Sequence, residues 1–463
     1  MDVLLVTPIS HTHYVIPPIG LGYLATAARR ADFNDISICD CLKEGHTWES
    51  LAEFLKKAQS RLVGIQVFSY ELGSVNRLLK LLKELNPDVI TVVGGVHLSA
   101  RGVAGLGDMP LADYAFQGEG EVGFPLLLRK LLREEPVEFV DIPGLIYREG
   151  DKAKANPRIV NEDLDVLGFP AWDLIPPAEY PENPQGAFYQ NFPIAPISTT
   201  RGCPFDCTFC ASPVNMGKLL RKRSITHVLD EMELLYCDHG VREFHIIDDA
   251  FNVERKRVLE FCEGLVQRQL KISYTFPNGL RLNMLDEEVL SRMKETGAYA
   301  FTVGIESGSE RILKAMKKKL SLDLIKEKVE LICRCGLEPS GFFILGFPDE
   351  TKEDMLKTIA FAKSLPLKRA HFSNFLPLPG TESTAKLLAS GEIDSINFEE
   401  MFYSKVPYAP KGVTQAELKA LQRKAFLEFH LRPRILLKML LEIKSWRHFK
   451  TIMTRAYDYL FVK

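Results

Sequence analysis

The sequence contains no uninterrupted run of about 20 apolar residues, the length that a membrane-spanning helix requires. It also lacks an excess of either charge, because 58 Lys+Arg stand against 60 Asp+Glu for a net charge of −2. This balance argues against a generally basic nucleic-acid binder. The N-terminal segment has neither a basic n-region nor a small-residue cleavage site, so we expect a cytoplasmic protein.

The first predicted domain covers residues 1–135. Short apolar runs alternate there with segments whose apolar residues recur at helical spacing, and the runs lie at 3–9, 36–39, 62–67, 89–95 and 114–121. This alternation predicts an α/β domain with a doubly wound parallel sheet. Ligands of such sheets bind beyond the carboxyl ends of the strands, which are small and glycine-rich in this sequence.

Three further regions follow. Residues 136–195 are rich in proline and predict a linker. Residues 196–385 contain six strand–helix units, which predict a partial (β/α)6 TIM-like barrel with its active groups on the loops after the strands. Residues 386–463 lose the strand pattern and predict a C-terminal helical region.

Three of the nine cysteines, Cys203, Cys207 and Cys210, form a C-x3-C-x2-C pattern directly after the first strand of the second alternation. A cubane iron–sulfur cluster normally takes one thiolate per iron, so three cysteines leave one iron open to a small molecule. The alternatives are free core cysteines or structural zinc. Structural zinc is normally closed by four protein ligands, and the sequence has no second C-x2-C pair.

This pattern at the end of a first barrel strand resembles the radical S-adenosylmethionine (SAM) superfamily, and the resemblance runs over essentially the whole chain. It implies a 4Fe-4S cluster on the three cysteines and SAM bound at the open iron. It also implies reductive cleavage of SAM to a 5′-deoxyadenosyl radical, with an electron donor such as flavodoxin or ferredoxin.

The resemblance also suggests which residues contact SAM. Asp248-Asp249-Ala250-Phe251 stands where many members have Gly-Gly-Glu, and this variant is similar to a subgroup with an N-terminal cobalamin-type domain. The candidate SAM contacts are Phe209, Asp248, Asp249, Glu306, Gly341, Ile344 and Gly346. Arg281 follows a strand and has two interpretations, a carboxylate or substrate contact and a structural ion pair.

The N-terminal domain resembles the B12-binding (cobalamin-binding) Rossmann-like domain of the same subgroup. The candidate cobalamin contacts are Ser69, Gly94, Gly95, His97 and Gly118. The Asp-x-His-x-x-Gly signature that supplies a lower cobalt ligand is missing, and His11 and His13 lie in the first loop at other spacing. Some relatives keep this domain without binding cobalamin, so the sequence is compatible both with a domain that binds cobalamin and with one that does not.

The subgroup includes methyltransferases, and the resemblance therefore implies a cobalamin-dependent methyltransferase acting on an unactivated carbon of a small-molecule substrate. The adenosyl radical would remove a hydrogen, and methylcobalamin would supply the methyl group. One alternative is a radical SAM enzyme of cyclisation, rearrangement or C–C coupling, with or without cobalamin. The other is a cluster- or corrinoid-binding sensor or carrier without turnover.

Residues 431–463 combine eight Lys/Arg with two Asp/Glu and several large apolar residues. One interpretation is a basic amphipathic segment on an anionic membrane surface, which would suit an apolar or lipid-like substrate. The other is a helix that covers the open side of the barrel with its basic face in water. The second interpretation is the one we favour.

Overall fold

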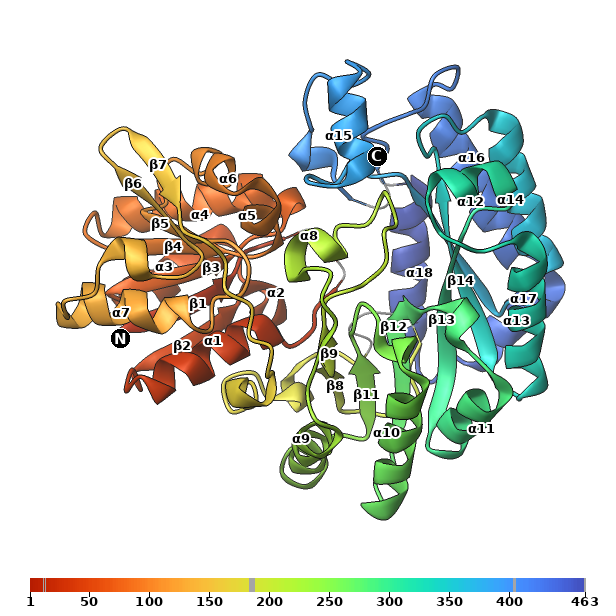
Figure 1. The fold of residues 1–463 in the computed structure, drawn as a ribbon, viewed down its shortest axis with the longest axis horizontal. Coiled ribbons are helices and arrows are strands. Elements are labelled where there is room, and N and C mark those ends of the chain that lie inside the picture. The colour runs from red at the N-terminus through yellow and green to blue at the C-terminus, as the bar shows by residue number, and fades with distance from the viewer. Residues whose placement is uncertain (11, 13, 183–187, 403–404, 462–463) are drawn as a thin grey trace. The chain divides into compact units, whose positions relative to one another are not determined.

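The computed structural model describes residues 1–461 except 11, 13, 183–187 and 403–404. The chain forms two compact units (Figure 1). Unit 1 consists of residues 1–181 with 214–217 and 221–223, and unit 2 consists of residues 182–213, 218–220 and 224–463. Among the described residues, no helix has both the length and the apolar composition to cross a bilayer.

Unit 1 contains a seven-stranded sheet in the order β2-β1-β3-β4-β5-β6-β7. Its strands are β1 (Val3–Thr7), β2 (Ile36–Asp40), β3 (Leu62–Gln66), β4 (Ile90–Gly94), β5 (Tyr114–Phe116), β6 (Leu145–Glu149) and β7 (Lys152–Ala155). Its helices are α1 (Ile19–Arg30), α2 (Cys41–Glu44), α3 (Trp48–Ala58), α4 (Leu72–Leu85), α5 (Val96–Arg101), α6 (Val103–Gly107) and α7 (Gly123–Arg133).

The first five strands of unit 1 are parallel. Helix α1 packs against α7, and α3 packs against α4, as expected when helices cover both faces of the sheet. Strands β1 and β3 are buried along most of their length, which explains their continuous apolar runs. This arrangement confirms the predicted doubly wound domain.

The sheet extends beyond the predicted strands. Strand β6 pairs antiparallel with β5, and β7 pairs antiparallel with β6. Both strands lie within 136–195, the segment predicted as a proline-rich linker. Only the inner half of β6 is buried and β7 is largely exposed, so neither strand carries the apolar run by which a buried strand is found in a sequence.

Unit 2 contains a six-stranded parallel sheet in the order β15-β14-β13-β12-β11-β8, as the predicted partial barrel requires. The strands are β8 (Ile194–Ile197), β11 (Glu243–Ile246), β12 (Ser273–Leu280), β13 (Ala298–Glu306), β14 (Glu338–Leu345) and β15 (Arg369–Asn374). Between β8 and the next long helix the chain forms β9 (Thr200–Arg201), α8 (Ser212–Met216) and β10 (Arg221–Lys222), of which β10 and most of α8 belong to unit 1.

The remaining helices follow the strands of unit 2 in chain order. They are α9 (Ile225–Asp238), α10 (Arg255–Gln267), α11 (Glu287–Glu295), α12 (Glu310–Ala315), α13 (Leu322–Arg334), α14 (Lys352–Ser364), α15 (Glu382–Ala389), α16 (Gln415–His430), α17 (Pro433–Leu441) and α18 (Trp446–Phe461). These helices include the C-terminal helical region predicted for 386–463.

Helices α16 and α18 pack on β15, which is one edge strand of the sheet. On the β15 side, the Tyr459 hydroxyl donates to the carbonyl of Phe372, and Phe429 of α16 is fully buried against Phe372. His448 of α18 packs against the ring of Phe188 at 5.7 Å, and the guanidinium of Arg369 in β15 lies 3.8 Å from the same ring. The C-terminal segment therefore packs on the β15 edge of the sheet, and the interpretation that it covers the open side of the barrel stays a prediction.

Candidate functional site

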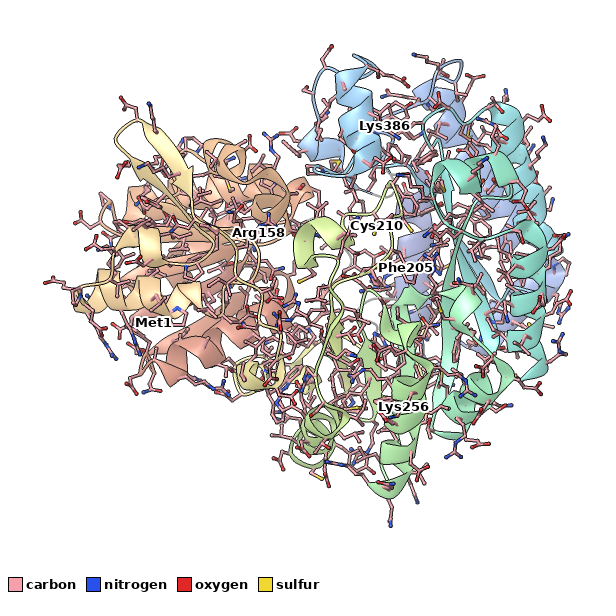
Figure 2. All side chains as sticks on the ribbon, viewed as in Figure 1. Met1, Arg158, Phe205, Cys210, Lys256 and Lys386 are labelled. Carbon is pink, nitrogen blue, oxygen red and sulfur yellow. The ribbon has the colours of Figure 1, made fainter. Side chains whose placement is uncertain are left out.

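The three cysteines of the C-x3-C-x2-C pattern lie on one loop between β9 and α8. Figure 2 labels Phe205 and Cys210 on this loop. Gly202 opens this loop at φ +92°, a conformation that a glycine adopts without strain. Cys203, Cys207 and Cys210 all line a single cavity of about 360 Å³. The other lining residues come mainly from the carboxyl ends of β12, β13, β14 and β15 and the loops that follow strands, the edge at which barrel enzymes hold their substrates.

The ligand set at this cavity suits an iron–sulfur cluster. Among the described residues that line it there is no fourth thiol and no histidine. Burial raises the pKa of the Cys203 thiol to about 11 and raises that of Cys210 as well. These thiols need a bound cation to lose their protons at neutral pH. Three soft ligands around one hollow fit a cubane with one open iron and do not fit a closed zinc site.

Four of the seven predicted SAM contacts line the cavity. They are Phe209, Asp249, Glu306 and Ile344. Glu306 ends β13 at φ +69°, a left-handed conformation that is strained for a residue with a side chain and that tends to occur at functional sites. Its Oε1 accepts a hydrogen bond of 2.6 Å from Lys318 Nζ, and both side chains are largely buried.

The other three predicted SAM contacts are not among the lining residues and have partners within the protein. Asp248 is buried and accepts hydrogen bonds from the Thr199 backbone N–H at 2.6 Å and from the Thr200 hydroxyl at 2.9 Å, so it fixes the segment that leads into the cysteine loop. A Cβ on Gly341 would lie 2.9 Å from the Phe343 ring, and a Cβ on Gly346 would lie 2.4 Å from Leu418 of α16. These glycines make room for neighbouring side chains.

Arg281 joins the cysteine loop to the rest of the cavity. Its guanidinium stacks on Phe205 at 3.8 Å, and Nη1 lies 3.8 Å from Cys207 Sγ. Nη2 donates to the carbonyl of Lys318 at 2.6 Å. None of these three contacts is with a carboxylate side chain, and the positive charge of Arg281 lies beside the predicted cluster ligand Cys207.

Sequence reasoning missed Lys318 because it stands in a run of three lysines, which usually predicts a solvated surface. Lys317 and Lys319 adopt left-handed φ of +53° and +56° on either side of it. Lys318 itself is directed to Glu306 in the cavity. Burial alone would lower the pKa of Lys318, but the nearby charges of Glu306 and Cys207 raise it overall, so the ammonium is retained.

In unit 1 the predicted cobalamin contacts gather around the ends of β3, β4 and β5. Ser69 Oγ lies 3.1 Å from His97 Nδ1, and Asp108 Oδ2 lies 3.2 Å from His97 Nε2. His97 is fully buried, and burial lowers its pKa, so this ring is held neutral between two polar partners. Both ring nitrogens are therefore engaged within the domain rather than turned toward a metal.

The three glycines predicted to contact cobalamin differ in their surroundings. Gly95, at φ +122°, follows β4, and a Cβ there would lie 2.9 Å from the carbonyl oxygen of Val67. Gly118, at φ +76°, faces the side chain of Arg158 and donates its N–H to Ser99 Oγ. A Cβ on Gly94 would make only an ordinary contact. His11 and His13 lie outside the described residues.

Comparisons with known proteins agree with this architecture. Residues 197–362 match the radical SAM superfamily, and residues 6–128 match the B12 binding domain. The chain is 33% identical over 427 residues to an uncharacterised methyltransferase of Pyrococcus horikoshii, covering 92% of this chain and 90% of that protein. It is 28% identical over 435 residues to cytidylyl-2-hydroxyethylphosphonate methyltransferase of Streptomyces wedmorensis, covering 83% and 80%.

A solved structure has the same fold. The radical SAM methyltransferase TsrM from Kitasatospora setae, with cobalamin and a [4Fe-4S] cluster bound, superposes with a TM-score of 0.70 at 19% identity and covers 91% of this chain and 82% of its own. Three observations support the same assignment: the matches in sequence, the B12-binding domain in unit 1, and the cavity lined by three cysteines in unit 2. The chain belongs to the family of cobalamin-dependent radical SAM methyltransferases, whose cofactors are a 4Fe-4S cluster, SAM and cobalamin.

Proposed function

We propose that this enzyme transfers a methyl group to an unactivated carbon of a small molecule, after reductive cleavage of SAM in the cavity of unit 2. The observation that carries the proposal is the presence of three thiols and no further thiol or imidazole among the described lining residues. A cluster held there supplies the electron that splits SAM, and methylcobalamin supplies the methyl group.

The residues of the cavity divide into ligands, polar contacts and an apolar wall. Cys203, Cys207 and Cys210 hold the cluster, and Asp249 and Glu306 offer carboxylates to the polar groups of SAM. Phe209 and Ile344 provide apolar contact on the same cavity. The remaining wall includes the apolar residues Phe342, Phe343, Phe375, Leu376 and Leu378. This wall excludes water and favours an apolar acceptor.

The first experiment tests SAM cleavage. Reconstituted protein with SAM and dithionite should yield 5′-deoxyadenosine, and C203A, C207A and C210A should each abolish it because each removes a cluster ligand. C237A is the matched control, because Cys237 is exposed on α9 and outside the cavity. If the cavity variants cleave SAM as well as C237A does, the proposed chemistry is wrong.

A second experiment separates methyl transfer from cyclisation or coupling. A methyltransferase that uses SAM to regenerate methylcobalamin forms S-adenosylhomocysteine together with 5′-deoxyadenosine. We expect both products when the protein is loaded with cobalamin, and a product heavier than the substrate by one methylene unit. 5′-Deoxyadenosine with no S-adenosylhomocysteine under these conditions would favour the alternative reaction.

For the C-terminal segment we propose contact with an anionic membrane surface, in addition to its contact with the barrel. Exposed apolar side chains gather on α17 and at the start of α18, and they include Leu437, Leu440, Leu441 and Trp446. Trp446 is 78% exposed and Leu441 is 77% exposed. Basic residues are interspersed with them in 431–463, a combination that is typical of helices lying in a lipid interface.

This contact is tested by vesicle sedimentation with phosphatidylglycerol-containing liposomes. The triple variant L437E/L441E/W446E should lose binding, because it adds negative charge to the exposed apolar surface without removing the barrel contacts of α18. V266E is the control, since Val266 is 52% exposed on α10. Equal sedimentation of the wild type and the triple variant would show that this segment does not bind lipid.

A further inference from the structure

A second hollow in unit 2, of about 440 Å³, is lined mainly by lysines. We call it the lysine surface, and its members are Lys218, Lys314, Lys317 and Lys319, with the carboxylates of Asp206 and Glu382. All four lysines are exposed. The whole chain carries a net charge of −2, so this positive excess is a local feature and not a consequence of composition.

The backbone between α12 and α13 places two of the four lysines, Lys317 and Lys319. Because Lys317 and Lys319 are both left-handed, they are directed to solvent while Lys318 between them pairs with Glu306 in the cavity. Lys314 and Lys319 form no ion pair with any residue that the structure describes, whereas Lys317 pairs with Glu382 at 2.6 Å. Two strained residues in so short a segment indicate that the arrangement is held by its surroundings.

The lysine surface is attached directly to the cysteine loop. Asp206 lies between Cys203 and Cys207 in the sequence and pairs with Lys218. The Thr208 backbone N–H donates to the carbonyl of Met316 at 3.1 Å, which connects the loop to the segment before Lys317. Arg281 joins the carbonyl of Lys318 to Cys207 Sγ. Few residues therefore separate the lysine surface from the cluster ligands.

We propose that the lysine surface docks the electron donor, a small acidic one-electron carrier protein of the flavodoxin type. Opposite charges would steer the carrier to the surface, and such electron-transfer encounters need only a small interface. In the transfer the carrier is oxidised by one electron and the cluster is reduced by one. The inference rests on the proposed function, since only a cluster that cleaves SAM reductively needs this electron.

The experiment compares two charge-reversal variants of the holoenzyme. K314E/K319E reverses two lysines of the lysine surface. K271E/K294E reverses two exposed lysines near the opposite ends of the strands, where β12 and β13 begin. Binding of a purified bacterial flavodoxin is measured by isothermal titration calorimetry at low salt. SAM cleavage is measured in parallel with reduced flavodoxin and with dithionite.

We expect K314E/K319E to bind flavodoxin on the order of tenfold more weakly than the wild type and to require correspondingly more flavodoxin for half-maximal SAM cleavage. Raising the salt concentration should narrow this difference. K271E/K294E should match the wild type, and dithionite should support equal rates in all three proteins. If flavodoxin does not bind the wild type, or if both variants respond alike, the docking site is overturned. Failure of SAM cleavage with dithionite would instead contradict the proposed function.

Discussion

Replacing Glu350 by glutamine should make the stability of the protein less dependent on pH. Glu350 is nearly fully buried after β14, and its Oε2 accepts the backbone N–H groups of Gly346 at 2.6 Å and Phe347 at 3.0 Å. Its Oε1 has no hydrogen-bond partner among the described residues. Burial raises the pKa of Glu350 to about 8, and the charge of Asp354 adds to this, although the two N–H donors and Arg311 oppose it.

The direction in which stability changes with pH follows from proton linkage. Glu350 is protonated in the folded protein up to about pH 8, whereas an unfolded glutamate releases its proton near pH 4.5. Its contribution to stability is therefore complete below pH 4.5 and is lost as the pH rises toward 8, at about 1.4 kcal/mol per pH unit. Glutamine keeps the acceptor and does not titrate. Between pH 6 and 7.5 the free energy of unfolding of E350Q, relative to wild type, should rise by about 2 kcal/mol.

Anaerobic urea unfolding at pH 6, 6.75 and 7.5 measures this difference. E353Q is the control, because Glu353 lies nearby on α14 but its side chain is 77% exposed. We expect the E353Q difference to change by much less than 2 kcal/mol over this range. A difference between E350Q and wild type that stays constant with pH would refute the assignment of a protonated, buried carboxyl at this position.

Three further changes test the site. In denaturant unfolding, G346A should lower the free energy of unfolding by roughly 2–4 kcal/mol, because it adds a Cβ 2.4 Å from Leu418 to a residue at φ +79°. The control G391A, at φ +67° with open space around it, should lower the free energy of unfolding by only about 1 kcal/mol. Equal losses in the two variants would rule out the clash with Leu418. R281M should lower the reduction potential of the cluster by roughly tens of millivolts in an anaerobic redox titration, because it removes a positive charge 3.8 Å from Cys207 Sγ. R281K keeps the charge and should keep most of the wild-type potential. An unchanged potential in R281M would contradict an effect of the Arg281 charge on the cluster. E306Q should raise the KM for SAM more than it lowers kcat if Glu306 binds SAM, whereas a change confined to stability would leave Glu306 as only the partner of Lys318.

The features that the sequence predicts well are local. Cys203, Cys207 and Cys210 lie within eight residues, so their spacing alone brings them to one loop. The apolar runs of β1 and β3 predict buried parallel strands because both faces of these strands are covered. Patterns of this kind depend on neighbouring residues, and they remain visible without knowledge of the tertiary structure.

The features that the sequence leaves undetermined depend on distant contacts. The approach of Leu418 from α16 to Gly346 and the hydrogen bond from Thr199 to Asp248 are examples, while the predicted SAM contacts of Gly346 and Asp248 stay predictions. Lys318 is distinguished from the lysines beside it only by the left-handed backbone on both sides. The role of Arg281 requires the approach of a loop 74 residues earlier in the chain. None of these relationships has a signal at fixed spacing in the sequence.

The central claim is that the three cysteines hold an iron–sulfur cluster in a chain that also carries cobalamin. Elemental analysis of anaerobically purified and reconstituted protein tests this most directly. We expect about four iron and four sulfide per chain, together with about one cobalt after loading with cobalamin, and loss of the iron but not of the cobalt in C203A/C207A/C210A. Stoichiometric zinc in place of iron, or iron that persists in the triple variant, would contradict the account.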